Sequence, residues 1–195
     1  MLVEKGRIDE AIDYGQQDLH AADNALTLAR ALREHDRPQA ALEIAQHGLS
    51  LDGNGKADLA EWLRDRAAGS DEPKVALEAA VAAFEAAPIF AAYQATEELA
   101  GDDWPAVRGE ILGSLASRDT TKRSVQRHVE IFLYAERYDE VIAIADRFSD
   151  DMVVESVADA VFEERRSGRS TPAKHRPNRP SRKGNYSSID MPWAG

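Results

Sequence analysis

One motif recurs five times along this chain of 195 residues: a short polar turn leads into a helix start, with an apolar residue three positions before a small or β-branched one. The positions that mark it are Ile8, Pro38, Pro73, Trp104 and Tyr138, which are spaced by 30, 35, 31 and 34 residues. A period of about 34 residues is typical of stacked two-helix repeats, in which each pair buries its apolar face against the next pair. The repeat therefore predicts a helical array, and such arrays provide surfaces instead of catalytic centres.

Apolar residues between these turns recur at spacings of three and four, so each segment has one apolar face when it is helical. Between residues 23 and 34 this face holds Ala25, Leu28, Ala29 and Leu32. Alanine is the best helix former, and aromatic residues make up only 7% of the chain, so the composition also favours helices. We expect an all-α fold with helices over about residues 23–34, 38–49, 59–67, 73–88, 90–99, 104–115, 121–135, 138–148 and 152–164.

Two of the helix starts resemble the second helix of the tetratricopeptide repeat (TPR), which opens Gly-x-Tyr-x-x-Ala and closes with a proline. They are Gly6–Ala11, which reads Gly-Arg-Ile-Asp-Glu-Ala, and the helix from Pro73 to Pro88. The resemblance implies a TPR-like right-handed α-solenoid of stacked helix pairs over residues 1–164. The segment 104–115 fits the repeat poorly. Armadillo or HEAT pairs, or an irregular helical bundle, have the same periodicity, so these alternatives stay open.

Charge is divided unevenly along the chain. Residues 1–164 hold 16 Lys and Arg against 34 Asp and Glu, and residues 165–195 hold 8 against 1, which gives net charges of −18 and +7. Such an acidic load repels nucleic acid and anionic membranes, and it keeps a protein in solution in concentrated salt. We interpret it as the signature of a halophilic cell. The alternatives are an acidic surface that recruits a basic partner and an ordinary acidic protein.

With this acidic, lysine-poor composition, segments 30–45 and 128–140 resemble the C-terminal helical region of haloarchaeal SWIM-type zinc finger proteins. In that family a Cys-x-Cys…Cys-x-His finger lies upstream. This chain has no cysteine, which excludes disulfides and thiolate metal sites and fits a cytoplasmic protein. The resemblance thus implies the helical scaffold with no cofactor in this chain, and zinc is expected only in the missing SWIM segment.

Both ends of the sequence depart from a complete repeat array. Met1 lies almost inside the second helix of a repeat, so we expect a truncated first repeat and a fragment or remnant of a longer protein. Residues 165–195 are basic and rich in Pro, Arg and Ser. Only 6 of these 31 residues are apolar, too few to offset the entropy of ordering them. We predict a disordered tail and favour a frameshift as its origin, over a basic arm that binds phosphates or a natural linker.

Few side chains suggest chemistry. The five histidines have no ligand spacing, so we predict that they are turn or surface residues and hold no metal. Aromatic residues recur at helical spacing, so we assign them to the core between repeats. We predict no catalytic, cofactor-binding or metal-binding residue. The histidines are His20, His35, His47, His128 and His175, and the aromatic residues are Trp62, Phe84, Phe90, Tyr93 and Trp104.

Two arginines, Arg30 and Arg33, are the candidate binding residues. In TPR-like stacks the first helices line a concave groove that holds a peptide. Two guanidinium groups on one such helix, amid acidic surroundings, would attract a carboxylate. Ordinary surface ion pairs with Glu34 or Asp36 are the alternative interpretation.

These observations predict a non-enzymatic protein-interaction scaffold with an unidentified protein or peptide partner, derived from a SWIM-type zinc finger protein. The alternative is a nucleic-acid-associated regulator whose zinc finger or catalytic domain is missing from this chain. The acidic body disfavours nucleic acid, which would bind only through the basic tail. No apolar run approaches 18 residues and the start lacks the pattern of a signal peptide, so we expect a cytoplasmic protein with no membrane contact.

Overall fold

A computed structural model describes residues 6–51 and 53–148, and within these ranges the chain is all-helical, with no strand. This confirms the all-α expectation for the described part of the chain. The helix expected over 152–164 and the tail over 165–195 lie outside the described residues. The elements are α1 (Ile8–Gln17), α2 (Ala22–Glu34), α3 (Pro38–Gly48), α4 (Lys56–Ala68), α5 (Pro73–Ala86), α6 (Phe90–Ala100), the 3₁₀ helix η2 (Gly101–Asp103), α7 (Trp104–Ser117), α8 (Val125–Tyr134) and α9 (Tyr138–Arg147).

The odd-numbered helices α1, α3, α5, α7 and α9 begin at the five residues that the sequence repeat marks. Proline stands at the first position of α3 and of α5, where its fixed φ suits a helix and its missing N–H has no helical partner to lose. These starts are determined by residues that are adjacent in sequence, which explains why the pattern locates them.

One turn recurs before three of these helices. Asp36, Asp71 and Glu136 have positive φ angles of 58°, 59° and 56°. In each case the next residue donates its amide N–H to the carbonyl five residues back, at 3.0, 3.0 and 2.8 Å respectively. This six-to-one hydrogen bond around a left-handed residue is the Schellman motif that ends helices. The sequence repeat is thus also a repeat of backbone geometry.

The junction between α6 and α7 departs from this turn. Gly101 has φ +50°, and η2 runs directly from it into α7 at Trp104. A second departure precedes α8, which begins at Val125 and not at the expected residue 121. There Thr121 forms a separate turn: its carbonyl accepts from the Ser124 and Val125 amides at 3.0 and 2.9 Å, and its amide N–H donates to Ser124 Oγ at 2.9 Å.

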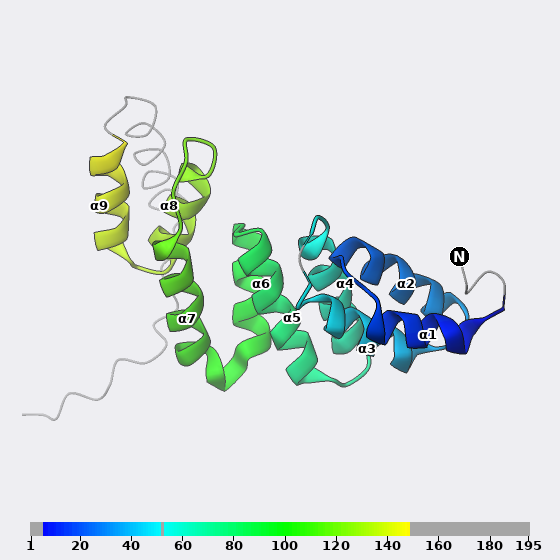
Figure 1. Cartoon of the computed structure of the whole chain (residues 1–195). Helices are drawn as coiled ribbons and strands as arrows, with labels where there is room; N and C mark the ends of the chain where they lie inside the picture. The colour runs from blue at the N-terminus through cyan, green and yellow to red at the C-terminus, as the bar shows by residue number, and fades with distance from the viewer. Residues whose placement is uncertain (1–5, 52, 149–195) are drawn as a thin grey trace, which may run out of the picture.

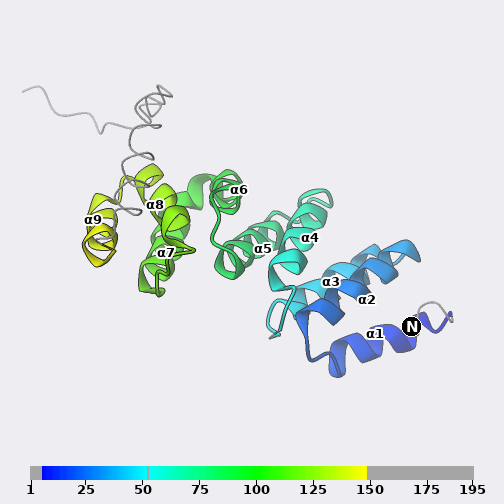
Figure 2. The same cartoon turned by 90° about the horizontal axis from the view of Figure 1, so that it is seen from above.

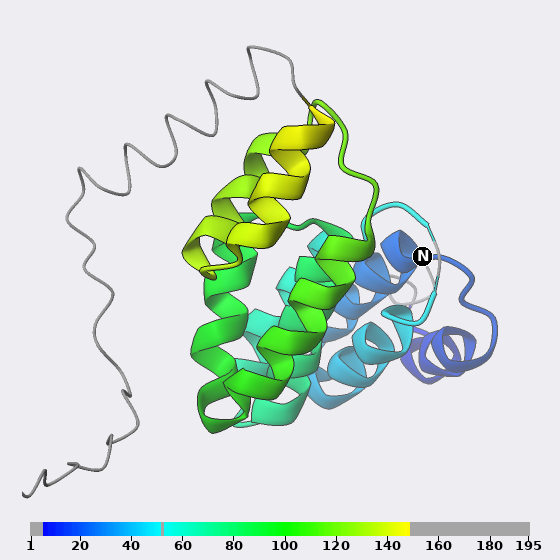
Figure 3. The same cartoon turned by 90° about the vertical axis from the view of Figure 1, so that its left-hand side faces the viewer.

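The helices follow one another in chain order from α1 at one end to α9 at the other (Figure 1), and the view from above shows the same order (Figure 2). Within the described ranges, every extensive helix contact joins neighbours or next-but-one neighbours, the largest being α4 with α5 and α2 with α3. Seen from the α9 end, the pair α8–α9 stands in front of the rest (Figure 3).

Buried apolar residues form two groups. The first core cluster runs from Ala11 to Ala79 and contains only Ala, Leu and Ile. The second core cluster runs from Phe84 to Ile144 and contains three buried aromatic residues. Helix α5 contributes to both clusters. Its contact with α4 is the most extensive in the described part of the chain. The two helices carry six alanines that are 2% exposed or less, and such small residues allow helices to approach closely. These residues are Ala60, Ala67, Ala76, Ala79, Ala80 and Ala83.

Candidate functional site

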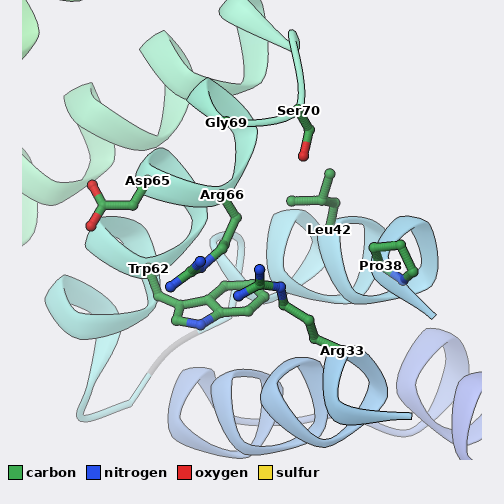
Figure 4. A pocket seen from close by; sticks show the side chains of 8 residues that line it. All are labelled: Arg33, Pro38, Leu42, Trp62, Asp65, Arg66, Gly69 and Ser70. Carbon is green, nitrogen blue, oxygen red and sulfur yellow. The ribbon is translucent and has the colours of Figure 1, made fainter. Parts of the chain in front are cut away.

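A small cavity of about 140 Å³ lies among α2, α3 and α4 (Figure 4). Three elements converge there: the last turn of α2, the first turns of α3 and the C-terminal half of α4, followed by the turn after α4. We call this cavity the two-arginine pocket. It is lined by Arg33, Pro38, Leu42, Trp62, Asp65, Arg66, Gly69 and Ser70.

Helical spacing places Trp62 and Arg66 side by side on α4, because residues four apart share a face of a helix. Arg33 reaches the same space from α2. In Figure 4 the guanidinium groups of Arg33 and Arg66 both lie near the Trp62 indole. The pocket therefore combines two cations and an aromatic ring that come from two different helices.

Arg66 carries an unsatisfied hydrogen-bond donor. Its Nε is buried and has no hydrogen-bond partner among the described residues, although the side chain as a whole is only partly buried. A buried donor without a partner costs about 1–3 kcal/mol, and more when the group is charged. The Arg66 side chain lines the pocket while its Nε lies buried beneath the surface.

Asp65 is the acidic residue of the pocket. Its Oδ1 accepts a hydrogen bond from Arg64 Nε at 2.9 Å and forms an ion pair with Arg64 Nη2 at 2.9 Å, and its side chain is 61% exposed. Because this carboxylate is held by Arg64, it does not neutralise the pair Arg33 and Arg66. The local charge is positive although the chain carries a net charge of −11.

The two predicted binding residues are separated by the structure. Arg33 lines the pocket, whereas Arg30 is exposed on α2 and is not among the lining residues. Neither arginine forms an ion pair with Glu34 or Asp36 in the described part of the chain, so the surface pairs considered as the alternative are not formed there.

Sequence reasoning missed two residues of the pocket. It did not single out Arg66, and it assigned Trp62 to the core. Trp62 does pack against the first core cluster, but it is only partly buried and also lines the pocket. The available signal was the spacing of Trp62 and Arg66, four residues apart, on a helix that follows Arg33 by one repeat.

The other aromatic residues pack together, as expected. Tyr93 is 1% exposed and makes edge-to-face contacts with Phe84, Trp104 and Tyr134 at ring-centre distances of 6.0, 5.2 and 5.8 Å. Burial raises the pKa of the Tyr93 hydroxyl to about 12. Tyr134 donates its hydroxyl to Glu97 Oε2 at 3.1 Å. This cluster is a packing centre of the second half.

The prediction that the histidines are turn or surface residues is wrong for His128. Its side chain lies on α8, is 3% exposed, and its Nδ1 is 3.1 Å from Thr120 Oγ1. Burial lowers the pKa of His128, and the nearby charges of Arg118 and Arg127 lower it further. Within the described ranges, no group of three or more His, Asp or Glu side chains is placed to hold a metal ion.

Among the described residues, no helix has the length and apolar character needed to cross a bilayer. In comparisons with known proteins, no family model, no curated protein and no solved structure matches this chain.

Proposed function

We propose that this chain is a non-enzymatic protein-interaction scaffold, a TPR-like α-solenoid that holds a protein or peptide partner. We propose further that it derives from a SWIM-type zinc finger protein and acts in the cytoplasm. The partner surface would be formed by the first helices of the pairs, α2, α4, α6 and α8, which in TPR-like stacks line the concave side.

One observation carries the proposal: the same left-handed turn precedes α3, α5 and α9, and the extensive helix contacts join only near neighbours. An array of this kind does not close on itself around a single core, so it offers a long surface for its size. The pocket also brings two arginines and an indole together, which are side chains that bind anions and apolar groups.

Site-specific photo-crosslinking tests the proposal. The photoreactive residue benzoylphenylalanine is placed in the full chain at exposed positions of first helices, Arg30 and Glu61, and as matched controls at exposed positions of second helices, Glu43 and Lys74. The chains are irradiated in an extract of the native cell at high salt. We expect one discrete partner crosslinked from positions 30 and 61 and not from 43 and 74. Crosslinks from no position, or equally from all four, would contradict the proposal.

A further inference from the structure

We propose that Asn54 is a site of spontaneous deamidation, at which the backbone nitrogen of Gly55 displaces ammonia from the Asn54 side chain. The pair lies in the turn between α3 and α4, and Gly55 immediately precedes the first residue of α4. Neither residue lines the two-arginine pocket, and the modification is independent of the scaffold function proposed above. The reaction needs no reactant other than water.

The reaction proceeds in two steps. The Gly55 nitrogen forms a bond to the Asn54 Cγ, the bond between Cγ and Nδ2 breaks, and Nδ2 leaves as ammonia with the Gly55 amide proton. Water then opens the resulting succinimide ring. Opening at Cγ gives aspartate, whereas opening at the backbone carbonyl carbon gives isoaspartate, in which Cγ becomes part of the main chain. Nothing is oxidised or reduced in either step.

The structure leaves the reacting groups free to meet. Asn54 is exposed, so water reaches its side chain. Gly55 is the N-cap of α4, and its carbonyl accepts the Leu59 amide at 2.9 Å. Its own N–H precedes the helical hydrogen bonds and forms no hydrogen bond within the described ranges. The nitrogen that attacks is therefore not held by the helix.

Glycine at position 55 also removes a steric obstacle. Gly55 has φ +83°, a left-handed conformation that residues with a Cβ rarely adopt. Because Gly55 has no Cβ, no side chain of its own shields its nitrogen from the Asn54 side chain. A Cβ built on Gly55 would lie 3.3 Å from the Asp23 Cβ, so this turn also lies close to the start of α2.

Asn24 provides a matched comparison within the same chain. It is exposed on α2, and the next residue, Ala25, donates its amide N–H to the Ala21 carbonyl at 3.2 Å. The nitrogen that would attack Asn24 is thus held by a hydrogen bond and carries a residue with a Cβ. The two asparagines are both exposed and differ in the freedom of the nitrogen that follows.

Deamidation changes the turn in two ways. Either product has a carboxylate in place of the neutral amide, so the turn near Asp23 gains a negative charge. Isoaspartate also lengthens the main chain by one carbon. A Cβ built on Gly53 would lie 3.5 Å from the Ala21 Cβ, so the added carbon falls where the turn is already close to α2. The modification therefore alters the chain where the starts of α2 and α4 meet.

Peptide mapping of the full chain tests the proposal. The folded protein is incubated at mildly alkaline pH and digested with trypsin, which places Asn54 in peptide 34–56 and Asn24 in peptide 8–30, each with no other asparagine. The mass increase from amide to acid measures deamidation, whereas isomerisation of Asp52 leaves the mass unchanged. We expect Asn54 to convert at least about tenfold faster than Asn24, because no helix hydrogen bond must break first.

Two controls assign the effect to the turn. Asn54→Gln should abolish the mass increase of peptide 34–56, because glutamine closes a larger ring much more slowly. In urea, conversion of Asn24 should accelerate by about tenfold or more as its helix hydrogen bond is lost, and that of Asn54 by less than about threefold. Far-UV circular dichroism verifies that Asn54→Gln retains its helices and that urea removes them.

Three results would overturn the proposal. The first is equal conversion of Asn24 and Asn54 in the folded chain. The second is a mass increase of peptide 34–56 that persists in Asn54→Gln. The third is an acceleration of Asn54 in urea as large as that of Asn24, which would show that folding restrains the Gly55 nitrogen as firmly as the Ala25 nitrogen.

Discussion

From α1 to α4 the buried side chains are Ala, Leu and Ile, whereas from α5 to α8 they include the rings of Phe84, Tyr93 and Phe132. The backbones also meet differently. A Cβ built on Gly48 would lie 2.4 Å from the Cβ of Ala25, so α2 and α3 are in very close contact there. In the second half, contacts between rings have centre distances of 4.9 to 6.0 Å.

The comparison shows that helix pairs with the same turn can be packed with two different kinds of core side chain. The turn before α3 and α5 also precedes α9, so both halves share it, although it is replaced by η2 before α7. Small residues allow α2 and α3 to approach closely in the first half, and rings pack against one another in the second. The local repeat therefore determines where helices begin, and the side-chain volumes determine how far apart they lie.

The largest expected effect is the removal of a ring from the second core cluster. Phe132→Ala should lower the free energy of unfolding by about 3–5 kcal/mol, because the residue is 2% exposed and its removal leaves a cavity. Urea denaturation followed by circular dichroism measures this. Ile142→Ala on α9 is the control, since Ile142 is 58% exposed, and should change stability by less than about 0.5 kcal/mol. Similar losses in both variants would show that the ring does not organise the second half.

Close packing in the first half predicts opposite signs for two Gly→Ala substitutions. Gly48→Ala should destabilise by about 1–3 kcal/mol, since the new Cβ meets Ala25 Cβ and Leu59 Cδ2 at 2.4 and 2.8 Å. Gly109→Ala on α7 should stabilise by about 0.5–1 kcal/mol, because nothing lies within 4 Å and alanine favours the helix. The same denaturation assay compares them. A stabilising Gly48→Ala would remove the contrast between the halves.

The shared turn predicts equal effects in both halves. Asp71→Gly and Glu136→Gly should each stabilise by about 0.5–1 kcal/mol, because both residues have positive φ and glycine relieves the strain of a Cβ there. Arg37→Gly, at φ −118°, is the control and should destabilise. Thermal unfolding at one protein concentration ranks the three variants by melting temperature. A gain in only one half would mean that the two turns are not equivalent.

The smallest effect is a pH dependence confined to the second half. Since the pKa of His128 is lowered by burial, the folded state binds fewer protons than the unfolded state just below pH 6.5. The stability from neutral His128 is complete above pH 6.5 and is lost as pH falls below it toward the lowered pKa. The melting temperature should therefore fall more between pH 7.5 and 5 in the wild type than in His128→Gln. Parallel curves for the two proteins would contradict this.

Helix positions were largely predictable because their causes lie close together in the sequence. The helix starts at Ile8, Pro38 and Tyr138 depend on a turn of a few residues and on the apolar spacing that follows. The start of α8 was placed too early, because Thr121 forms a separate turn with Ser124 and Val125 before the regular helix begins, and apolar spacing does not distinguish this turn from the helix.

The burial of His128 had a signal that was overlooked. It lies three residues after Val125 and four before Phe132, both buried, so it shares the apolar stripe of α8. Residue type was given more weight than position, and position was the better guide.

The candidate pocket was predictable only in part. Arg33 was chosen for its charge and its place on a first helix, and it does line the pocket. Its partners Trp62 and Arg66 lie about one repeat further on, and no local rule says which side chains of two successive helices share a cavity. The exclusion of Arg30 from the pocket was equally unpredictable, because Arg30 lies only three residues from Arg33 on the same helix.

By itself, the sequence determined that the described chain is helical, where most helices begin, and that charge is divided between an acidic body and a basic end. These properties follow from hydrogen bonds and composition within short stretches of chain. Only the tertiary structure decided that Arg33 and Arg66 face one pocket, that His128 is buried, and that Gly48 lies against Ala25. The physical reason is that contacts between helices depend on the distance and rotation between them. The volumes of many side chains together determine this distance and rotation.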